Sequence, residues 1–369
     1  MEENPFTPSF GEIPLHLAGR SEIIRSFQRA FESQGRRPEL TTIFSGARGT
    51  GKTSLMAYLA DCAEQSGWIA VRTTALPGMM EDIEIQLQRK ASHLLKPHPS
   101  LNLNQIGIPD VLSFGLSPST QAPSNWRSRI EDALEQLAES DTGLLIVIDE
   151  VDPSLDEMIQ TAAIYQQFVI DKRKVSLVMA GLPHNTSTLI TNKTVSFLRR
   201  SNQIYLQRIE DYEIERALTR TIADGNRRID PAALRLASSA IKGFPFMLQL
   251  VGYHAWDENP QENVINLESA RNAIEIAQRE MGSRIFAATF AELSPEDVRF
   301  LCAMLDDDGD SAIADIIQRL DRSSSQVAQY RRRLIDAGII GRRTRGVVGF
   351  DLPFFREYLL ERLEDEGIR

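Results

Sequence analysis

Between positions 46 and 53 the chain reads Gly46-Ala47-Arg48-Gly49-Thr50-Gly51-Lys52-Thr53. This run matches G-x-x-x-x-G-K-[ST], the Walker A pattern of a phosphate-binding loop. Residues 41–45 before it have the composition of a short buried strand, and residues 54–60 after it have helical spacing. The motif therefore stands in the strand–loop–helix context that it requires. Because of that context, the alternative of a glycine-rich surface turn is strongly disfavoured.

The residue types in this loop suit nucleotide phosphates. Glycines allow backbone N–H groups to turn inward around the phosphates, and the following helix directs its positive end at them. Lys52 is expected to reach the β- and γ-phosphates, and Thr53 to ligate Mg²⁺ through its hydroxyl. The sequence predicts ATP or ADP with Mg²⁺ as cofactors, and a nucleotide contact set of Gly46, Ala47, Arg48, Gly49, Thr50, Gly51, Lys52, Thr53 and Ser54.

A second motif, of the Walker B kind, reads Leu144-Leu145-Ile146-Val147-Ile148-Asp149-Glu150. A continuous apolar run that ends in two acids is typical of a central parallel strand whose carboxyl end opens into the nucleotide crevice. We expect Asp149 to help hold Mg²⁺ and Glu150 to polarise an attacking water, so Glu150 and Lys52 are predicted catalytic residues. The alternative is a core strand that ends in a polar turn, and the presence of the Walker A loop disfavours it.

Composition describes an ordinary globular protein. The chain has 369 residues, of which 42% are hydrophobic and 25% charged, enough for two or three domains. Its net charge of −10 argues against a protein that coats nucleic acid over its whole surface. Cys62 and Cys302 are far apart, which fits a reducing compartment and argues against a disulfide scaffold or a zinc site. The N-terminus lacks a signal-peptide pattern and no apolar run approaches membrane length, so we expect a cytoplasmic protein without membrane contact.

Residues 17–20, Leu17-Ala18-Gly19-Arg20, lead into a predicted helix over 22–33. This entry resembles that of many AAA+ ATPases, and the expected strand between the loop strand and the Walker B strand resembles the additional-strand group of NTPases. The resemblance implies that Leu17, Gly19 and Arg20 lie against the adenine. A simple helix-entry turn with a surface arginine is the alternative.

Two further places match the family less well. AAA+ relatives carry a polar sensor residue near the end of the strand expected at 175–181, but here the first polar residues after it are His184 and Asn185. We expect His184 to be a surface or helix-entry residue. Arg199 and Arg200 stand where relatives carry an arginine finger, which implies that Arg200 reaches the γ-phosphate of a neighbouring subunit. The alternative is that both arginines solvate a helix end.

Helical patterns cover 212–224, 231–241, 244–256 and 267–281, a unit of the size of the AAA+ lid. Within it, residues 243–249 resemble the lid segment of replication-initiator-like and archaeal-type ATPases. Relatives often place an arginine there, but this segment has none, and Lys242 is the nearest cation.

The last 80 residues predict helices at 296–304, 311–320 and 324–337, a two-stranded wing at 342–350 and a closing helix at 354–363. This order resembles a winged helix-turn-helix whose recognition helix and turn lie in 330–340. Eight arginines and two acids lie between 319 and 345, a local charge of +6. The predicted DNA contacts are Arg331, Arg332, Arg333, Arg343 and Arg345. The alternative is a winged helix that binds protein, because an acidic loop at 306–310 lies on the same unit.

We therefore predict an α/β fold: a P-loop NTPase core of the additional-strand, AAA+-like kind with a parallel sheet and an extended N-terminal arm (1–207), a helical lid (208–285) and a C-terminal winged helix-turn-helix (286–369). The expected function is a slow ATPase whose nucleotide state positions the winged helix on double-stranded DNA, with a homo-oligomer or a protein partner as a further possibility. One alternative is a STAND-like signalling switch with the winged helix as an internal or protein-binding module. Another is a non-enzymatic regulator that retains ATP. Residues 97–124, with a hairpin strand expected at 111–116, resemble a family-specific insertion.

Overall fold

A five-stranded parallel sheet forms the centre of the N-terminal part of the molecule, which we describe from a computed structural model covering residues 3–9, 12–95, 123–352 and 354–365. Its strands are β1 (Thr41–Ser45), β2 (Ile69–Thr74), β3 (Leu144–Asp149), β4 (Val175–Gly181) and β5 (Asn202–Tyr205). They pair in the order β2-β3-β4-β1-β5, so β4 is the additional strand expected between the loop strand and the Walker B strand. The hairpin expected at 111–116 lies outside the described residues.

Helices cover both faces of this sheet because its central strands are apolar on both sides. On one face α1 (Ser21–Phe31) and α2 (Lys52–Gln65) share a buried cluster with β1 and β3. On the other face α3 (Met79–Lys90), α4 (Pro123–Glu139) and α5 (Asp156–Ile170) pack together. The carboxyl ends of β1, β3 and β4 meet at one edge, where Ser45 pairs with Gly181, and α6 (Pro183–Thr191) begins at the same edge.

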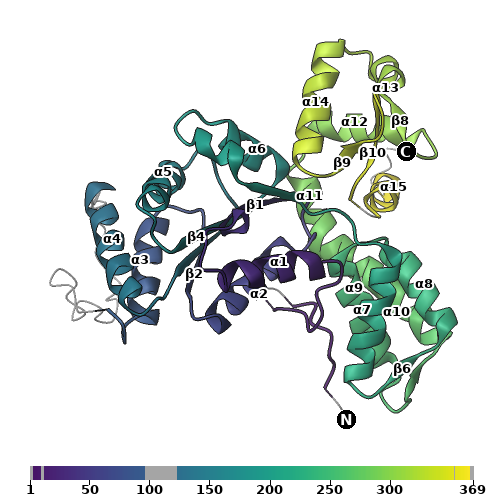
Figure 1. The fold of residues 1–369 in the computed structure, drawn as a ribbon. Coiled ribbons are helices and arrows are strands. Elements are labelled where there is room, and N and C mark those ends of the chain that lie inside the picture. The colour runs from purple at the N-terminus through teal and green to yellow at the C-terminus, as the bar shows by residue number, and fades with distance from the viewer. Residues whose placement is uncertain (1–2, 10–11, 96–122, 353, 366–369) are drawn as a thin grey trace, which may run out of the picture.

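A four-helix unit follows the sheet, as the sequence predicted. It consists of α7 (Asp211–Asp224), α8 (Pro231–Ile241), α9 (Pro245–Glu258) and α10 (Leu267–Met281). A short parallel pair, β6 (Arg228–Ile229) and β7 (Val264–Ile265), closes its far end and was not predicted. Figure 1 shows this four-helix unit, which we call the lid, beside the sheet domain.

The N-terminal arm lies on the lid. Phe6 is 2% exposed and packs where Gly252 leaves no side chain. The Thr7 N–H donates to Gln249 Oε1 at 3.0 Å, and the Asn4 side-chain amide donates to the Tyr253 carbonyl at 3.1 Å. The N-terminal arm therefore ties the lid to the beginning of the sheet domain.

A continuous helical run joins the lid to the C-terminal unit. After α10 the chain continues through a π-helical segment, Gly282–Phe286, into α11 (Ala287–Ala291). Buried side chains of the lid and of the C-terminal unit form one hydrophobic cluster across this connection. The boundary predicted between 285 and 286 falls inside this run, and the three-domain division stays a prediction.

The C-terminal unit contains α12 (Pro295–Leu305), β8 (Ser311–Ala312), α13 (Ile313–Leu320), α14 (Ser324–Asp336), β9 (Ile340–Arg342), β10 (Val347–Phe350) and α15 (Phe355–Asp365). Its strands form an antiparallel sheet in the order β8-β10-β9. The prediction that helix covers all of 311–320 is wrong at its start, because Ser311 and Ala312 pair with Val348 and Val347 of β10. No helix in the described part of the chain is long and apolar enough to cross a membrane.

Candidate nucleotide-binding site

The phosphate loop lies between β1 and α2, and two of its glycines have left-handed backbone conformations. Gly49 has a φ of +75° and Gly51 a φ of +81°, values that residues with side chains rarely adopt. Gly51 is also the N-cap of α2. The Thr50 hydroxyl donates to the Ala47 carbonyl at 2.8 Å and closes the loop on itself. The loop backbone thus turns at a helix N-terminus, where anions bind most readily.

Lys52 is held inside the loop. Its ammonium group donates to the carbonyls of Gly46 at 3.0 Å and Ala47 at 2.9 Å, and the residue is 6% exposed. Burial lowers the pKa of Lys52, and the carboxylates of Glu150 and Asp149 oppose that shift. Within the described residues the hydrogen-bond acceptors of this buried cation are neutral carbonyls, so it is a strong binding group for an anion that enters the loop.

Thr53 and the Walker B acids lie together at the sheet edge. The Thr53 hydroxyl donates to Asp149 Oδ2 at 2.6 Å. The Glu150 N–H donates to Asp149 Oδ1 at 2.9 Å, and Glu150 has a left-handed φ of +51°. Hydroxyl and carboxylate oxygens are the ligands that Mg²⁺ prefers. The residues present therefore fit a magnesium ion between Thr53 and Asp149.

Arg20 connects the phosphate loop to the linker between core and lid. Its guanidinium donates to the carbonyls of Thr50 at 3.3 Å and Gln207 at 3.2 Å. The side chain is buried, and burial lowers the pKa of Arg20 against the opposing charge of Glu213. Arg20 is therefore not the surface arginine of the alternative interpretation.

Leu17, which the resemblance places against the adenine, lies beside the phosphate loop at its contact with the lid. A cavity of about 30 Å³ lies between residues 14–20, the phosphate loop and the lid. Gly19 lies against the lid linker, because an added methyl group would be 2.9 Å from side-chain atoms of Ile209 and Glu213. Ligand pockets measure about 300–1,000 Å³, so this space is about a tenth or less of the size of a typical ligand pocket. The space is lined by Pro14, His16, Leu17, Ala18, Arg20, Thr50, Gly51, Pro245, Leu248 and Gln249.

The lid covers the loop with an aromatic ring. A methyl group added at Gly49 would lie 2.5 Å from Cζ of Phe244, and one at Gly51 would lie 3.6 Å from Pro245. Phe244 is 2% exposed. Gly49 is therefore needed for lid packing as well as for backbone conformation, whereas a methyl group at Gly51 would only be in ordinary contact with Pro245.

The C-terminal unit also lies on the loop. A methyl group added at Gly338, in the turn after α14, would be 2.8 Å from Cβ and 2.9 Å from Cα of Ala47. Arg48 makes an ion pair with Glu292 at 3.0 Å. A cavity of about 150 Å³ lies beside this contact, with Arg48 and Glu292 in its wall. Sequence reasoning missed these contacts because they join segments about 240 to 290 residues apart, and no local pattern marks such pairs.

A second contact joins the linker between core and lid to the sheet of the C-terminal unit. Arg208 donates to the carbonyls of Phe350 at 3.2 Å and Asp351 at 2.8 Å. The C-terminal unit is therefore held at the loop and at the core–lid linker together.

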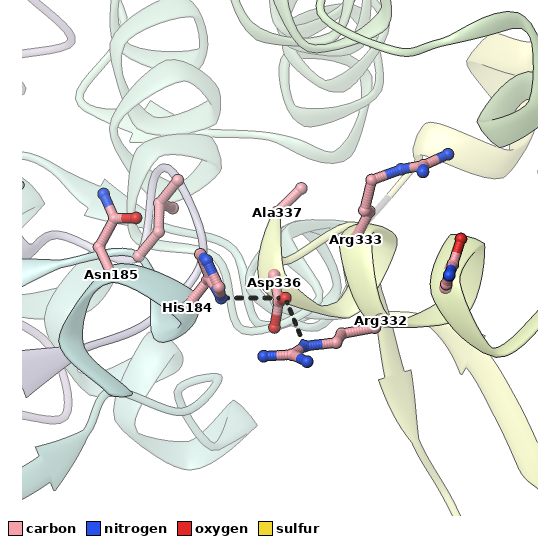
Figure 2. Close-up of a pocket in the computed structure, with 8 residues that line it drawn as sticks. His184, Asn185, Arg332, Arg333, Asp336 and Ala337 are labelled. Carbon is pink, nitrogen blue, oxygen red and sulfur yellow. Dashed lines mark ion pairs between the residues drawn. The ribbon is translucent and has the colours of Figure 1, made fainter. Parts of the chain in front are cut away.

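His184 and Asn185 lie in the first turn of α6, facing α14 across a cavity of about 490 Å³ (Figure 2). His184 Nδ1 lies 3.1 Å from Asp336 Oδ2, and the histidine side chain is 45% exposed. His184 is therefore at a helix entry, as expected, but it also contacts the C-terminal unit. The Asn185 side-chain amide donates to the Val151 carbonyl at 2.9 Å.

Arg200 is exposed at the end of the 3₁₀ segment Ser196–Arg200, one residue before Ser201 and β5. Exposure is compatible with a role toward another subunit and equally with a solvated helix end. The arginine-finger role stays a prediction.

The local charge of +6 in the C-terminal unit overstates its positive potential. Arg333 pairs with Asp297 at 2.7 Å, and Arg343 pairs with Asp351 at 2.8 Å and Asp310 at 3.2 Å. Those acids are close in space but lie outside the arginine-rich segment. Similar pairs join Arg319 to Asp307, Arg322 to Glu296 and Arg332 to Asp336. Of the five predicted DNA contacts, Arg331 and Arg345 make no ion pair within the described residues.

Comparison with known proteins agrees with this geometry. Residues 16–169 match the family model of the AAA ATPase domain, and residues 283–359 match that of a domain of unknown function. The Walker-type ATPase PABY2304 of Pyrococcus abyssi is 15% identical with a TM-score of 0.63, and the match covers 93% of this chain and 96% of that one. The ADP form of the Aeropyrum pernix ORC2 protein is 12% identical with a TM-score of 0.55, and the match covers 97% of both chains. No curated protein matches the sequence.

At these identities the solved structures establish the fold alone, and the match to the AAA ATPase family model is confined to residues 16–169. That segment contains the phosphate loop, Asp149 and Glu150 in one site. Residues 16–169 are therefore similar to an AAA ATPase domain, and the chain has the fold of the solved Walker-type ATPase.

Proposed function

We propose that this chain is an ATP-hydrolysing switch in which nucleotide at the phosphate loop determines whether the C-terminal unit stays docked on that loop. The observation that carries the proposal is the contact of Gly338 with Ala47. The same loop would hold phosphates on one side and the C-terminal unit on the other. A ligand that binds one arrangement better than the other shifts the population toward it.

The chain's own residues suit the hydrolysis step. Bound Mg·ATP supplies the transferable γ-phosphoryl group and the charge neutralisation that it needs. With nucleotide bound, Lys52 would exchange its carbonyl partners for phosphate oxygens, Thr53 and Asp149 would hold the metal, and Glu150 would accept a proton from the attacking water. In an assembly of subunits, Arg200 would add positive charge at a neighbour's site.

The lid and the C-terminal unit both lie against the phosphate loop, and this closed arrangement is the reason to expect a switch. The space on the adenine side is about 30 Å³, and Phe244 lies over the loop. Nucleotide entry therefore requires the lid to move away from Arg20 and Thr50. Because one hydrophobic cluster joins lid and C-terminal unit, a lid movement carries the C-terminal unit with it. We infer that nucleotide binding undocks Gly338 and Glu292 from the loop.

An intramolecular distance measurement tests this switch. Fluorophores attached through Lys172→Cys on the core and Thr344→Cys on the C-terminal unit, in a Cys302→Ser background, report their separation. Both label positions are exposed. ATP is expected to change the energy transfer, and a Lys52→Met variant, which lacks the loop cation, is expected not to respond. Tight ATP binding without any change in transfer would rule out the switch.

A second candidate function is ATP-dependent binding of double-stranded DNA by the C-terminal unit, interpreted as a winged helix. Its support is the order of three helices followed by a β9–β10 hairpin, together with Arg331 and Arg345 on the expected recognition helix and wing. The paired Arg333 and Arg343 do not support it.

Anisotropy titrations of duplex DNA across a salt series, with and without ATP, test the DNA proposal. An Arg331→Ala/Arg345→Ala variant is expected to weaken binding and to reduce the salt slope by about one for each lost phosphate contact. Arg235→Ala, an exposed lid arginine, is the matched control. Absence of binding by the wild type at low salt would leave protein-facing signalling as the role of the C-terminal unit.

A further inference from the structure

The first turn of α6 joins the Walker B acids to the C-terminal unit through two consecutive side chains. Asn185 donates to the Val151 carbonyl at 2.9 Å, directly after Glu150. His184 Nδ1 lies 3.1 Å from Asp336 Oδ2 at the end of α14. Figure 2 shows His184 directed at Asp336 across the gap between the two units, with Asn185 on the core side.

The backbone at Glu150 depends on its neighbours. Its φ of +51° lies in the left-handed region, which a residue with a side chain keeps only when the surroundings enforce it. Three hydrogen bonds do so here. The Glu150 N–H donates to Asp149 Oδ1 at 2.9 Å, the Val151 N–H donates to the Ala180 carbonyl at 2.8 Å, and the Val151 carbonyl accepts from Asn185.

We propose that Asn185 is a positioning residue for Glu150, and that the His184–Asp336 contact makes this positioning depend on the docked C-terminal unit. This proposal rests on the switch proposed above. It says how docking of the C-terminal unit would affect the backbone at Glu150. Asn185 acts through the Val151 backbone, because its amide is already committed to that carbonyl. When ATP moves α14 away, the first turn of α6 loses its contact with Asp336, and the bond to Val151 weakens without being lost. Asn185 therefore still positions Glu150 in the ATP-bound form, but less firmly than in the docked form.

A pair of isosteric substitutions tests the positioning role. Asn185→Asp keeps the shape of the side chain but removes the N–H donor. Asn192→Asp makes the same chemical change at the other end of α6, where the side-chain oxygen accepts from Thr194 and can still do so. Single-turnover hydrolysis and the Kd of a fluorescent ATP analogue are measured for both. We expect Asn185→Asp to slow hydrolysis by about tenfold or more with Kd changed less than about threefold, a loss confined to the chemical step.

The control Asn192→Asp should match the wild type in both quantities. An unchanged hydrolysis rate in Asn185→Asp, or a rate and Kd that worsen in the same proportion, would overturn the positioning role.

Hydrogen exchange tests the link without relying on hydrolysis. With a non-hydrolysable ATP analogue and with no nucleotide, exchange is followed in peptides containing Glu150 and Val151. Asp336→Ala is expected to speed exchange there in the nucleotide-free protein, and Asp308→Ala, an exposed acid on the same unit, is expected not to. Removing Asp336 also removes an acid from a helix C-terminus, so helix loss is not expected to cause the effect.

The outcomes separate this proposal from the proposed function. Faster exchange in Asn185→Asp and Asp336→Ala in a chain that binds but does not hydrolyse ATP would support the link and refute the hydrolysis. Unaltered exchange in both variants of a chain that does hydrolyse ATP would refute the link alone.

Discussion

Gly49 illustrates how a single residue of the phosphate loop serves two requirements. Its left-handed φ of +75° disfavours any side chain, and Phe244 occupies the space that a methyl group would need. Gly67 has a similar φ of +80° but no atom within 4 Å of an added methyl group. A comparison of substitutions at the two positions therefore separates the effect of backbone strain from the effect of the contact with the lid.

We predict that Gly49→Ala destabilises the protein more than Gly67→Ala does. Both variants carry the left-handed penalty of about 1–2 kcal/mol, and only Gly49→Ala also displaces Phe244. Urea unfolding measures the free energies. A Phe244→Ala background should reduce the difference between the two glycine variants, and equal losses in the wild-type background would contradict the lid contact.

At the scale of elements, Arg333 stabilises the beginning of α12 from its place on α14. Ser294 and Asp297 form a capping box at the start of α12, and Arg333 donates to both. Asp297 is 5% exposed, so removal of Arg333 would leave a buried carboxylate without this cationic partner.

We expect Arg333→Ala to lower the free energy of unfolding by about 1–3 kcal/mol, the cost of leaving a buried polar group unpaired. Arg331→Ala on the same helix should stay within about 0.5 kcal/mol of the wild type. Chemical denaturation checks both values. A loss of DNA binding in Arg333→Ala would therefore be uninformative unless its stability were restored.

The acidic loop after α12 has a pH-dependent contact. Hydrogen bonds from Arg319 and Ser311 lower the pKa of Asp307 to about 2. Because the folded pKa lies below the ordinary value, the stability from this contact is present above about pH 4 and is lost as the pH falls toward 2.

Thermal unfolding at pH 5 and at pH 2.5 tests this contact. Arg319→Gln should lower Tm at pH 5 and lose less Tm on acidification than the wild type. Asp308→Asn, next to Asp307 and exposed, should follow the wild-type curve. Parallel acid curves for Arg319→Gln and the wild type would contradict the assignment.

At the scale of the whole molecule, the Arg48–Glu292 pair connects the phosphate loop to the C-terminal unit at 3.0 Å. Its side chains are 40% and 60% exposed, so its contribution is that of a surface pair, about 0–1 kcal/mol. Reversing one charge turns the attraction into a repulsion that favours the open arrangement.

We predict that Glu292→Lys raises the apparent affinity for ATP by about two- to fivefold, because less binding energy is spent on opening the closed form. Isothermal titration calorimetry measures the affinity. Glu364→Lys, an exposed change of the same charge on α15, should leave it unaltered. Weaker ATP binding by Glu292→Lys would show that docking assists nucleotide binding.

The sequence by itself was sufficient for the elements whose causes are local. The Walker A loop, the apolar run before Asp149 and Glu150, and the periodic helices at 231–241 and 267–281 each depend on neighbours within one turn or strand, so their patterns are visible in the chain. The additional strand β4 followed from the resemblance. Ser311 and Ala312 were missed as a strand because their partners in β10 lie 35 or more residues away.

Only the tertiary structure decided what covers the phosphate loop and which charges are neutralised. Phe244, Gly338 and Glu292 reach the loop from segments about 200 to 290 residues away, and no local pattern requires them to. The arginines of α14 and the β9–β10 hairpin look unpaired in sequence, yet Asp297, Asp310 and Asp351 pair with two of them in space. Local hydrogen bonding and periodicity determine elements, whereas long-range contacts that form only when the elements pack determine how the phosphate loop of this protein is covered.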